Sequence, residues 1–361
     1  MTLRILSIYY CQNGHSPVSV PSLYEFPSMS WISSLLFRLG LGGTLLLAAT
    51  ACHKDNDSAD DPSQVTFTQA GLYPEGTQYD DNNDRFLVSS QTAGRIGQVK
   101  DDGTYSQFAD DAQLVSTIGL KLDQAGGRNR LLAAVSDPGY NTSRTSTATQ
   151  RKLAAVAIFN ATSGAKTGYV DLGALRPNAS AHFANDIAVD DAGNAYVTDS
   201  FAPIIYKLDA QGSATVFLEN SALAAAAGTF GLNGIVYHPG GYLLVAKSDE
   251  GALIKVPLAN PSGFTKVTTT GLTLTGDDGL QLTDNNTLLV ACNAQGQVYR
   301  LSSTDNFGSV SQTGSFATGA VYPTTLARRN GQSYVLYSYL SALQRMQSPA
   351  VSQFSLVRVG F

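Results

Sequence analysis

The stretch FANDIAVDDAGNAYVTDSFAPIIYKLDAQGSATVFLE, from Phe183 to Glu219, contains four short apolar runs separated by polar turns. The runs IAVD, AYVTD, IIYKLD and ATVFLE have the length and composition of β-strands, and the turns DAGN, SFAP and AQGS supply Gly, Asn or Pro where the backbone reverses. Four antiparallel strands of this length cannot bury both faces of their sheet alone, so they need similar sheets stacked against them. The stretch therefore predicts one unit of a repeated all-β fold.

Six segments of the chain open with a comparable dipeptide, which is followed by an apolar run, a turn and a second apolar run. These opening dipeptides are Glu75-Gly76, Ile118-Gly119, Asn185-Asp186, Asn233-Gly234, Asp278-Gly279 and Thr324-Thr325. Successive dipeptides lie 43 to 48 residues apart, except for one interval of 67 residues that contains the polar segment Gly139–Arg151. Four-stranded units that recur at this spacing are typical of β-propellers.

The six units predict an all-β, six-bladed β-propeller with four-stranded antiparallel blades over residues 65–361. We expect the segment Gly139–Arg151 to form a loop over one face of the ring. The early run Val65–Gln69 or the closing run Phe354–Val359 would complete one blade from both chain ends and close the ring. Because the innermost strand of every blade begins at the same mouth of a central channel, the first residues of the opening dipeptides are expected to face a common axis.

The composition is that of a folded protein that does not bind nucleic acid. Of the 361 residues, 43% are hydrophobic and 14% are charged, which provides enough apolar side chains for a large core. The net charge is −5, and Lys and Arg are scattered, whereas a nucleic-acid site needs a concentrated basic face. Three cysteines provide no disulfide framework, and Cys292, in the apolar run LLVAC, is expected to be a buried core residue.

Residues 1–51 are interpreted as a leader that takes no part in the fold. The thirteen residues from Leu39 to Ala51 carry no charge; they are too few to span a bilayer but suit the core of a signal peptide. The small residues before Cys52 resemble a bacterial lipoprotein box, and translation is expected to start at Met29. Cys52 is then the lipidated residue, and residues 52–64 form an acidic tether. The alternative is an ordinary secretory signal with a coincidental cysteine.

This leader predicts a lipoprotein of the bacterial cell envelope, anchored to a membrane. Contact with the membrane is expected only through the lipid on Cys52, and the acidic residues that follow it also fit display on the cell surface. We expect a monomer whose partner is a small-molecule substrate.

The first residues of the opening dipeptides would bring carboxylates and carboxamides to one mouth of the channel. They are Glu75, Ile118, Asn185, Asn233, Asp278 and Thr324. Converging carboxylates repel one another at short range, and a bound cation removes this cost. Oxygen donors without nearby His or Cys favour Ca²⁺ over zinc or copper, although another hard divalent cation fits the same donor types. Asn and Asp are also common turn formers, so the prediction depends on their shared register in separate blades.

These motifs resemble the family of gluconolactonase, regucalcin and luciferin-regenerating enzyme, whose members are six-bladed, calcium-dependent propellers. The resemblance covers about residues 72–340 and depends on EG at Glu75, ND at Asn185, NG at Asn233 and DG at Asp278. It implies that Glu75, Asn233 and Asp278 are metal ligands and that Asn185 lies beside the metal or the substrate.

The chain departs from the family pattern near this expected site. The family's EGPxW is EGTQY here, and the Arg that sugar-lactone members often carry two residues before the first Asn is replaced by Phe183. With His182 beside Phe183, this mouth is less suited to a polyhydroxylated sugar acid. We expect Asn185, His182 and Thr324 to contact the substrate.

The resemblance implies calcium-dependent hydrolysis of a lactone or a related ester. In this hypothesis the cation binds the carbonyl oxygen of the substrate and stabilises the oxyanion, while Asp278 orients or deprotonates the attacking water. One alternative is a non-catalytic binding propeller of the cell envelope that holds a structural metal. A condensing enzyme similar to strictosidine synthase is disfavoured, because no acidic residue outside the metal ring is obviously placed to act as its base.

Overall fold

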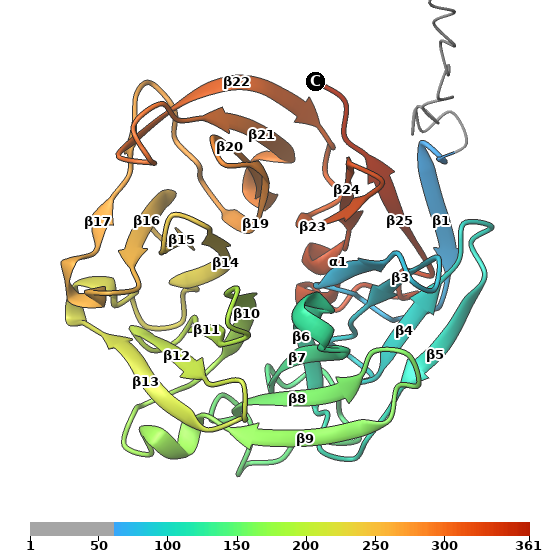
Figure 1. Cartoon of the computed structure of the whole chain (residues 1–361). Coiled ribbons are helices and arrows are strands. Elements are labelled where there is room, and N and C mark those ends of the chain that lie inside the picture. The colour runs from blue at the N-terminus through green and yellow to red at the C-terminus, as the bar shows by residue number, and fades with distance from the viewer. Residues whose placement is uncertain (1–60) are drawn as a thin grey trace, which may run out of the picture. The chain divides into compact units, whose positions relative to one another are not determined.

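A computed structural model describes residues 61–361, whose six β-sheets form a ring (Figure 1). Each sheet has four antiparallel strands, and one sheet gains a fifth, short parallel strand. These sheets are the blades of an all-β, six-bladed propeller, as the repeated segments predict. The leader, the lipidation residue Cys52 and most of the tether lie outside the described residues.

Blades 1 to 3 follow one another along the chain, each from its innermost strand to its outermost strand. Blade 1 consists of β2 (Thr77–Asp80), β3 (Arg85–Val88), β4 (Ile96–Val99) and β5 (Tyr105–Ala109). Blade 2 consists of β6 (Ser116–Asp123), β7 (Arg130–Ser136), β8 (Ala154–Asn160) and β9 (Lys166–Asp171). Blade 3 consists of β10 (Ala184–Val189), β11 (Ala195–Asp199), β12 (Ile204–Leu208) and β13 (Ala214–Glu219), which confirms the four strands expected in the opening stretch.

Blades 4 to 6 complete the ring. Blade 4 consists of β14 (Leu232–His238), β15 (Tyr242–Lys247), β16 (Ala252–Pro257) and β17 (Thr265–Lys266). Blade 5 consists of β19 (Asp277–Asp284), β20 (Thr287–Cys292), β21 (Gln297–Ser302) and β22 (Ser309–Ala317), to which β18 (Thr268–Thr269) adds in parallel. Blade 6 consists of β23 (Pro323–Arg329), β24 (Gln332–Tyr337), β25 (Gln353–Arg358) and β1 (Gln64–Thr68).

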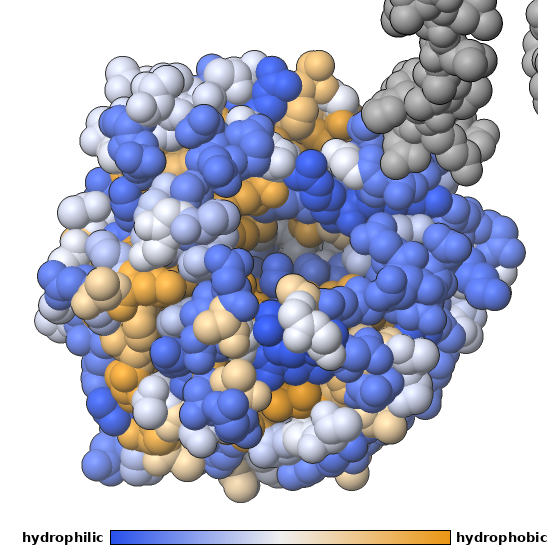
Figure 2. Space-filling view, viewed as in Figure 1, coloured by the Kyte–Doolittle hydropathy of each residue, from blue (hydrophilic) through white to orange (hydrophobic). Residues whose placement is uncertain are grey.

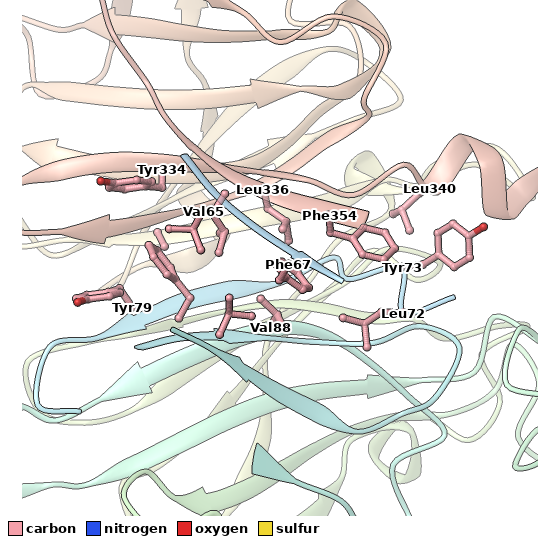
Figure 3. Close-up of a cluster of buried hydrophobic side chains, with 14 of the residues drawn as sticks. Val65, Phe67, Leu72, Tyr73, Tyr79, Val88, Tyr334, Leu336, Leu340 and Phe354 are labelled. Carbon is pink, nitrogen blue, oxygen red and sulfur yellow. The ribbon is translucent and has the colours of Figure 1, made fainter. Parts of the chain in front are cut away.

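Both ends of the described chain enter blade 6 and close the ring. Strand β1 pairs with β25 in antiparallel register, with Val65 opposite Leu356 and Phe67 opposite Phe354. The early run and the closing run proposed from the sequence therefore both contribute a strand to blade 6. The early run forms the outermost strand, and the closing run forms the strand next to it. Figure 3 shows the cluster of apolar side chains at this junction, where blade 6 packs against blade 1. Each large apolar side chain buried there contributes about 1.5–3 kcal/mol, so the closure holds without a covalent link.

In the described part of the chain, helical segments are few and short. They are α1 (Leu340–Gln344) and the 3₁₀ turns η1 (Ala125–Gly127), η2 (Gly173–Leu175), η3 (Ser221–Leu223), η4 (Pro261–Gly263) and η5 (Asn293–Gln295). Within residues 61–361, no helix has both the length and the apolar character that crossing a membrane requires. The segment Gly139–Arg151 is a loop between β7 and β8, as expected; Asn141 Nδ2 and Arg144 Nη1 donate to the carbonyl oxygens of Val115 (2.6 Å) and Leu114 (2.9 Å).

Five of the six opening dipeptides lie in β-bulges of the inner strands, and Glu75-Gly76 directly precedes β2. In β10, Ala184 pairs with Asp199 and Ile187 with Val197, so Asn185 and Asp186 occupy a stretch with one residue more than its partner strand. The same shift interrupts β6, β14, β19 and β23 at their own dipeptides. A bulge bends its strand and changes the direction of its side chains, which makes it a common device beside functional sites.

Glycine at the second position of the dipeptide lets neighbouring inner strands approach closely. A Cβ atom on Gly234 would overlap the carbonyl oxygen of Asp278 in the next blade, and one on Gly76 would overlap that of Ile118. Only glycine tolerates such backbone contact. The small residue therefore brings the first residues of adjacent dipeptides together around the axis.

Candidate metal centre and its cavity

A cavity of about 360 Å³ lies where the inner strands converge. Its lining includes Glu75, Ile118, Asn185, Asn233 and Asp278, which are five of the six first residues of the opening dipeptides. Figure 2 shows a hollow at the centre of the ring, where the inner strands of Figure 1 meet. The volume is at the small end of the range for small-molecule sites, roughly 300–1,000 Å³.

Three buried oxygen atoms in this cavity have no hydrogen-bond partner in the described part of the chain. They are Oε2 of Glu75, Oδ1 of Asn185 and Oδ1 of Asn233, whose residues are only 3–6% exposed. A buried acceptor without a partner costs about 1–3 kcal/mol, and such groups are rare in folded proteins. Three of them around one cavity indicate that a ligand completes the site.

The amide groups are held so that their oxygens remain free. Asn185 Nδ2 donates to Ser200 Oγ at 2.9 Å, and Asn233 Nδ2 donates to Ser248 Oγ at 3.0 Å. In each case the serine lies fifteen residues after the asparagine. Because each Nδ2 atom donates to its serine, the oxygen is the polar atom of each amide that has no partner among residues 61–361.

Asp278 is buried and accepts a hydrogen bond from Asn293, which follows it in the sequence at the same separation as the serines follow the asparagines. Asn293 Nδ2 donates to its Oδ2 atom at 2.9 Å. Burial raises the pKa of Asp278 to about 7; hydrogen bonds from Asn293 and Asn233 oppose this rise, and the charge of Asp186 adds to it. Burial also raises the pKa of Glu75 well above its usual range, and the charges of Asp278 and Asp186 add to that rise. The two carboxylates therefore disfavour one another's ionisation when no cation is bound.

The donor set fits a hard divalent cation. It consists of two carboxylates and two amide oxygens, the donor types that Ca²⁺ prefers. Among residues 61–361, no group of three or more His, Cys, Asp and Glu side chains is close enough to hold a metal, so the donor set has to include the amide oxygens. No His or Cys of this part of the chain lines the cavity, so the lining lacks the nitrogen and sulfur ligands that select zinc or copper. Glu75, Asn233 and Asp278, with Asn185 beside them, are the residues that could hold the ion.

His182 and Thr324 do not line the cavity. Thr324 is fully buried, and its hydroxyl donates to the carbonyl oxygen of Glu75 at 2.7 Å, which joins blade 6 to blade 1 behind the cavity. His182 is 4% exposed, with Nδ1 2.7 Å from a carboxylate oxygen of Asp199 and Nε2 3.1 Å from the carbonyl oxygen of Arg176. Both side chains are occupied by the scaffold instead of facing the position where we expected them to contact substrate.

Other residues line the cavity that the sequence alone did not single out. Tyr322 has a left-handed backbone conformation, with φ of 55°, which is strained for a tyrosine and is found most often at functional sites. Burial raises the pKa of its hydroxyl to about 12, and the nearby charge of Asp278 adds to the rise. Phe201, Phe230 and Arg151 also belong to the lining. Asn293 could have been found, because its separation from Asp278 repeats that of the two Asn–Ser pairs.

No protein-family model and no curated protein matches the chain, whereas many solved structures share its fold. The major allergen Mala s 1 of Malassezia sympodialis matches with a TM-score of 0.66 and 20% identity, over 83% of this chain and 96% of the allergen. A gluconolactonase from Xanthomonas campestris matches with a TM-score of 0.56 and 14% identity, over 82% and 89% of the two chains. Regucalcin from Agrobacterium tumefaciens, described as a calcium-binding protein, matches with a TM-score of 0.55 and 15% identity, over 81% and 92%.

At these identities the matches show a shared fold and leave the chemistry to be argued from this chain's own residues. The resemblance drawn from the EG, ND, NG and DG motifs is confirmed at that level, because gluconolactonase and regucalcin both appear among the matching structures. In fold, the chain is similar to the gluconolactonase and regucalcin propellers.

Proposed function

We propose that the protein is a calcium-dependent hydrolase that cleaves a lactone or a related ester in the central cavity. The proposal depends mainly on one observation, the unpartnered buried oxygens of Glu75, Asn185 and Asn233 beside the carboxylate of Asp278. Together these groups form an all-oxygen donor set for a hard divalent cation. Similarity in fold to a calcium-binding protein and to a gluconolactonase supports the choice of ion and reaction.

In this proposal Glu75, Asn233 and Asp278 hold the ion, and Asn185 orients the substrate next to it. A calcium ion held by these residues would supply Lewis-acid chemistry, that is, polarisation of the substrate carbonyl and stabilisation of the negative charge that develops on its oxygen. Asn293 fixes Oδ2 of Asp278, so the carboxylate keeps one orientation in the cavity. The hydroxyl of Tyr322, which lines the same cavity, can donate a further hydrogen bond to the developing oxyanion.

The hydrolysis itself needs only water as co-reactant. The water oxygen adds to the carbonyl carbon, the acyl carbon–oxygen bond breaks, and a proton of the water passes to the leaving oxygen, so a lactone opens to a hydroxy acid. Asp278 orients this water and assists removal of its proton. Because a carboxylate beside a cation has a lowered pKa and is a weak base, orientation is its larger contribution.

The test combines metal analysis with a hydrolase screen. The purified chain should contain calcium or bind it on addition, and a panel of lactones, aryl esters and phosphotriesters should reveal turnover that stops when calcium is chelated. Turnover should also be lost in Asp278→Asn. Calcium binding without turnover of any panel member would replace this proposal with a binding propeller that holds a structural metal. A chain that binds no divalent cation would exclude both functions.

We further propose that the protein is a monomeric envelope lipoprotein anchored through Cys52. The support is the leader sequence described above, with its uncharged run and the small residues before the cysteine. Cells grown with labelled palmitate should label the wild-type protein, and Cys52→Ser should abolish the label and release the protein from the membrane fraction. Label that persists in Cys52→Ser would contradict the anchor.

A further inference from the structure

The cavity also indicates which esters it accepts. We infer that its substrate carries an aromatic ring and an anionic group. The ring packs against a cluster of three phenylalanines in the cavity lining, through the two less buried members of that cluster, and the anionic group pairs with Arg151. The three phenylalanines, Phe183, Phe201 and Phe230, are called the aromatic wall below. The ester or lactone bond rests on the proposed function, whereas the ring and the anion are argued from the cavity alone.

The aromatic wall is a mutually packed cluster on one side of the cavity lining. Its ring centroids are 5.2 Å apart for Phe183 and Phe201, 5.1 Å for Phe183 and Phe230, and 5.1 Å for Phe201 and Phe230. These separations are typical of favourable edge-to-face and tilted aromatic pairs. Phe230 is 38% exposed, although it is a large apolar side chain. A ring bound against it would cover that surface and continue the cluster.

The wall is held in place from behind by one buried carboxylate. Oδ1 of Asp199 accepts hydrogen bonds from the backbone N–H groups of Phe183 at 2.8 Å and of Phe201 at 3.1 Å. Its other oxygen lies 2.7 Å from His182 Nδ1 and accepts a hydrogen bond from the hydroxyl of Tyr206 at 3.2 Å. Both phenylalanines are therefore fixed before a ligand arrives, and His182 contributes to the wall without contacting the ligand.

Arg151 is the only positively charged side chain among the described residues that line the cavity. Its guanidinium carbon lies 4.5 Å from the ring centroid of Phe201, and it forms no ion pair with a carboxylate of residues 61–361. A guanidinium in this setting is available to a carboxylate, which it binds with two parallel hydrogen bonds. Its position over Phe201 places the cation next to the apolar wall.

This combination selects against polyhydroxylated ligands. A sugar acid needs hydrogen-bond partners along its whole length, because hydroxyls that lose water without gaining a partner cost free energy. The aromatic wall offers rings in place of hydrogen-bond partners to such a ligand, and the unpartnered oxygens near Asp278 belong to the proposed cation site. Polar side chains elsewhere in the lining, such as Gln91 and Gln344, leave the part of the ligand that faces the wall without partners. The volume of about 360 Å³ also limits the ligand to a small molecule.

The experiment measures binding of three non-hydrolysable probes by calorimetry, with the full chain in calcium-containing buffer. The probes are 3-phenylpropanoate, which has a ring and an anion, 3-phenylpropanamide, which has the ring alone, and gluconate, which has an anion and hydroxyls. Loss of either feature should weaken binding about tenfold, as expected when one ion pair or one packed ring is lost. Gluconate binding as tightly as 3-phenylpropanoate would overturn the inference.

Two variants with matched controls assign the contacts. Arg151→Gln should reduce the affinity for 3-phenylpropanoate to that for the amide; its control is Lys152→Gln, the next residue, whose exposed side chain lies outside the cavity lining. Phe230→Ala should weaken both phenyl probes about tenfold; its control is Phe361→Ala, an exposed phenylalanine outside the cavity. Undiminished binding in Arg151→Gln would mean that the carboxylate of the probe does not pair with Arg151. Undiminished binding in Phe230→Ala would mean that the phenyl ring of the probe does not pack against the aromatic wall.

Failure of this inference and failure of the proposed function give different results. If the probes bind as expected but no ester is hydrolysed, the binding specificity stands and the hydrolase proposal fails. If esters are hydrolysed with no preference for 4-acetoxybenzoate over its neutral methyl ester, and the probes bind without preference, the hydrolase stands and this inference fails. The calorimetric comparison does not depend on turnover.

Discussion

The two ends of the inner strands treat buried acidic groups in opposite ways. At the far end of β2 and β6 stand Asp80 and Asp123, which are no more than 4% exposed. Arg85 pairs with Asp80 at 3.0 Å, while Arg128 and Arg130 both pair with Asp123 at 2.8 Å. Each of these carboxylates has the arginine partner that a buried charge requires.

At the cavity end of the inner strands, Glu75 and Asp278 are buried to the same degree, but no arginine or lysine between residues 61 and 361 pairs with either. Their neighbours Asn185 and Asn233 add two more unpartnered oxygens. Both ends belong to the inner strands and both hold buried acidic side chains. The two ends therefore differ in the group that neutralises the negative charge. At one end the chain supplies the cation, and at the other we propose that an ion from solution supplies it.

The largest effect should come from Asp278→Asn. This change keeps the shape of the side chain and removes the charge that orients water and binds calcium. We expect kcat/KM to fall by about 10³, within the range for loss of a positioned acid–base group. Circular dichroism should show an intact fold, because the buried carboxylate is the costly group in the metal-free protein. Activity close to that of the wild type would contradict the proposed mechanism.

The second effect is a pH dependence of stability that calcium should remove. A folded-state pKa of about 7 for Asp278, raised mainly by burial, means that the metal-free fold keeps a proton that the unfolded chain releases near pH 4. Stability is therefore lost as the pH rises from about 4 to 7, at about 1.4 kcal/mol per pH unit for this group. Metal-free protein should show a falling Tm over that range.

Two comparisons decide whether this slope belongs to the site. Added calcium should flatten it at neutral pH, because the ion binds the ionised carboxylates, and calcium affinity should increase up to about pH 7. The Asp278→Asn variant should lose part of the slope even without calcium. A metal-free Tm that rises between pH 5 and 7 would show that ionisation of the buried Asp278 does not destabilise the metal-free fold as we expect.

The repeated opening dipeptides allowed much of this site to be predicted from sequence. Equivalent positions in stacked blades must face one axis, so Glu75, Asn185, Asn233 and Asp278 could be grouped although they are far apart in the chain. The ring closure was also predictable, because the apolar runs at the two chain ends belonged to no other blade and could complete the sixth one. Repetition supplied the long-range information that a single sequence ordinarily lacks.

The details that depend on side-chain direction could not be predicted in the same way. Side chains alternate along an extended segment, so Phe183, two residues before Asn185, lines the cavity, whereas His182 points into the blade. Thr324 shares the register but hydrogen-bonds to Glu75 behind the cavity. The bulges depend on strand register, and the aromatic wall joins blade 3 to the loop before blade 4, so neither follows from a local pattern.

The third prediction perturbs the end where charges are already paired. Asp123→Asn removes the charge from a carboxylate that two arginines share. We expect a loss of about 2 kcal/mol in the free energy of unfolding, as for hydrogen bonds to a charged group, with unchanged calcium affinity and kcat/KM. Denaturant unfolding and calcium titration measure the two quantities separately. A loss of calcium binding in a folded Asp123→Asn protein would contradict the division between the two ends.

The smallest effect should come from Ser248→Ala, which leaves every proposed ligand in place. Ser248 Oγ accepts a hydrogen bond from Asn233 Nδ2 at 3.0 Å and donates to the carbonyl oxygen of Asp277. Without the serine, the amide can rotate and present its NH₂ group to the ion. The loss of about 1 kcal/mol corresponds to roughly fivefold weaker calcium binding. The control is Ser262→Ala in the same blade region, where the serine hydroxyl contacts only Asn260. Equal calcium affinity in both variants would mean that the Asn233 oxygen is not a ligand, since orientation of that amide would then have no effect.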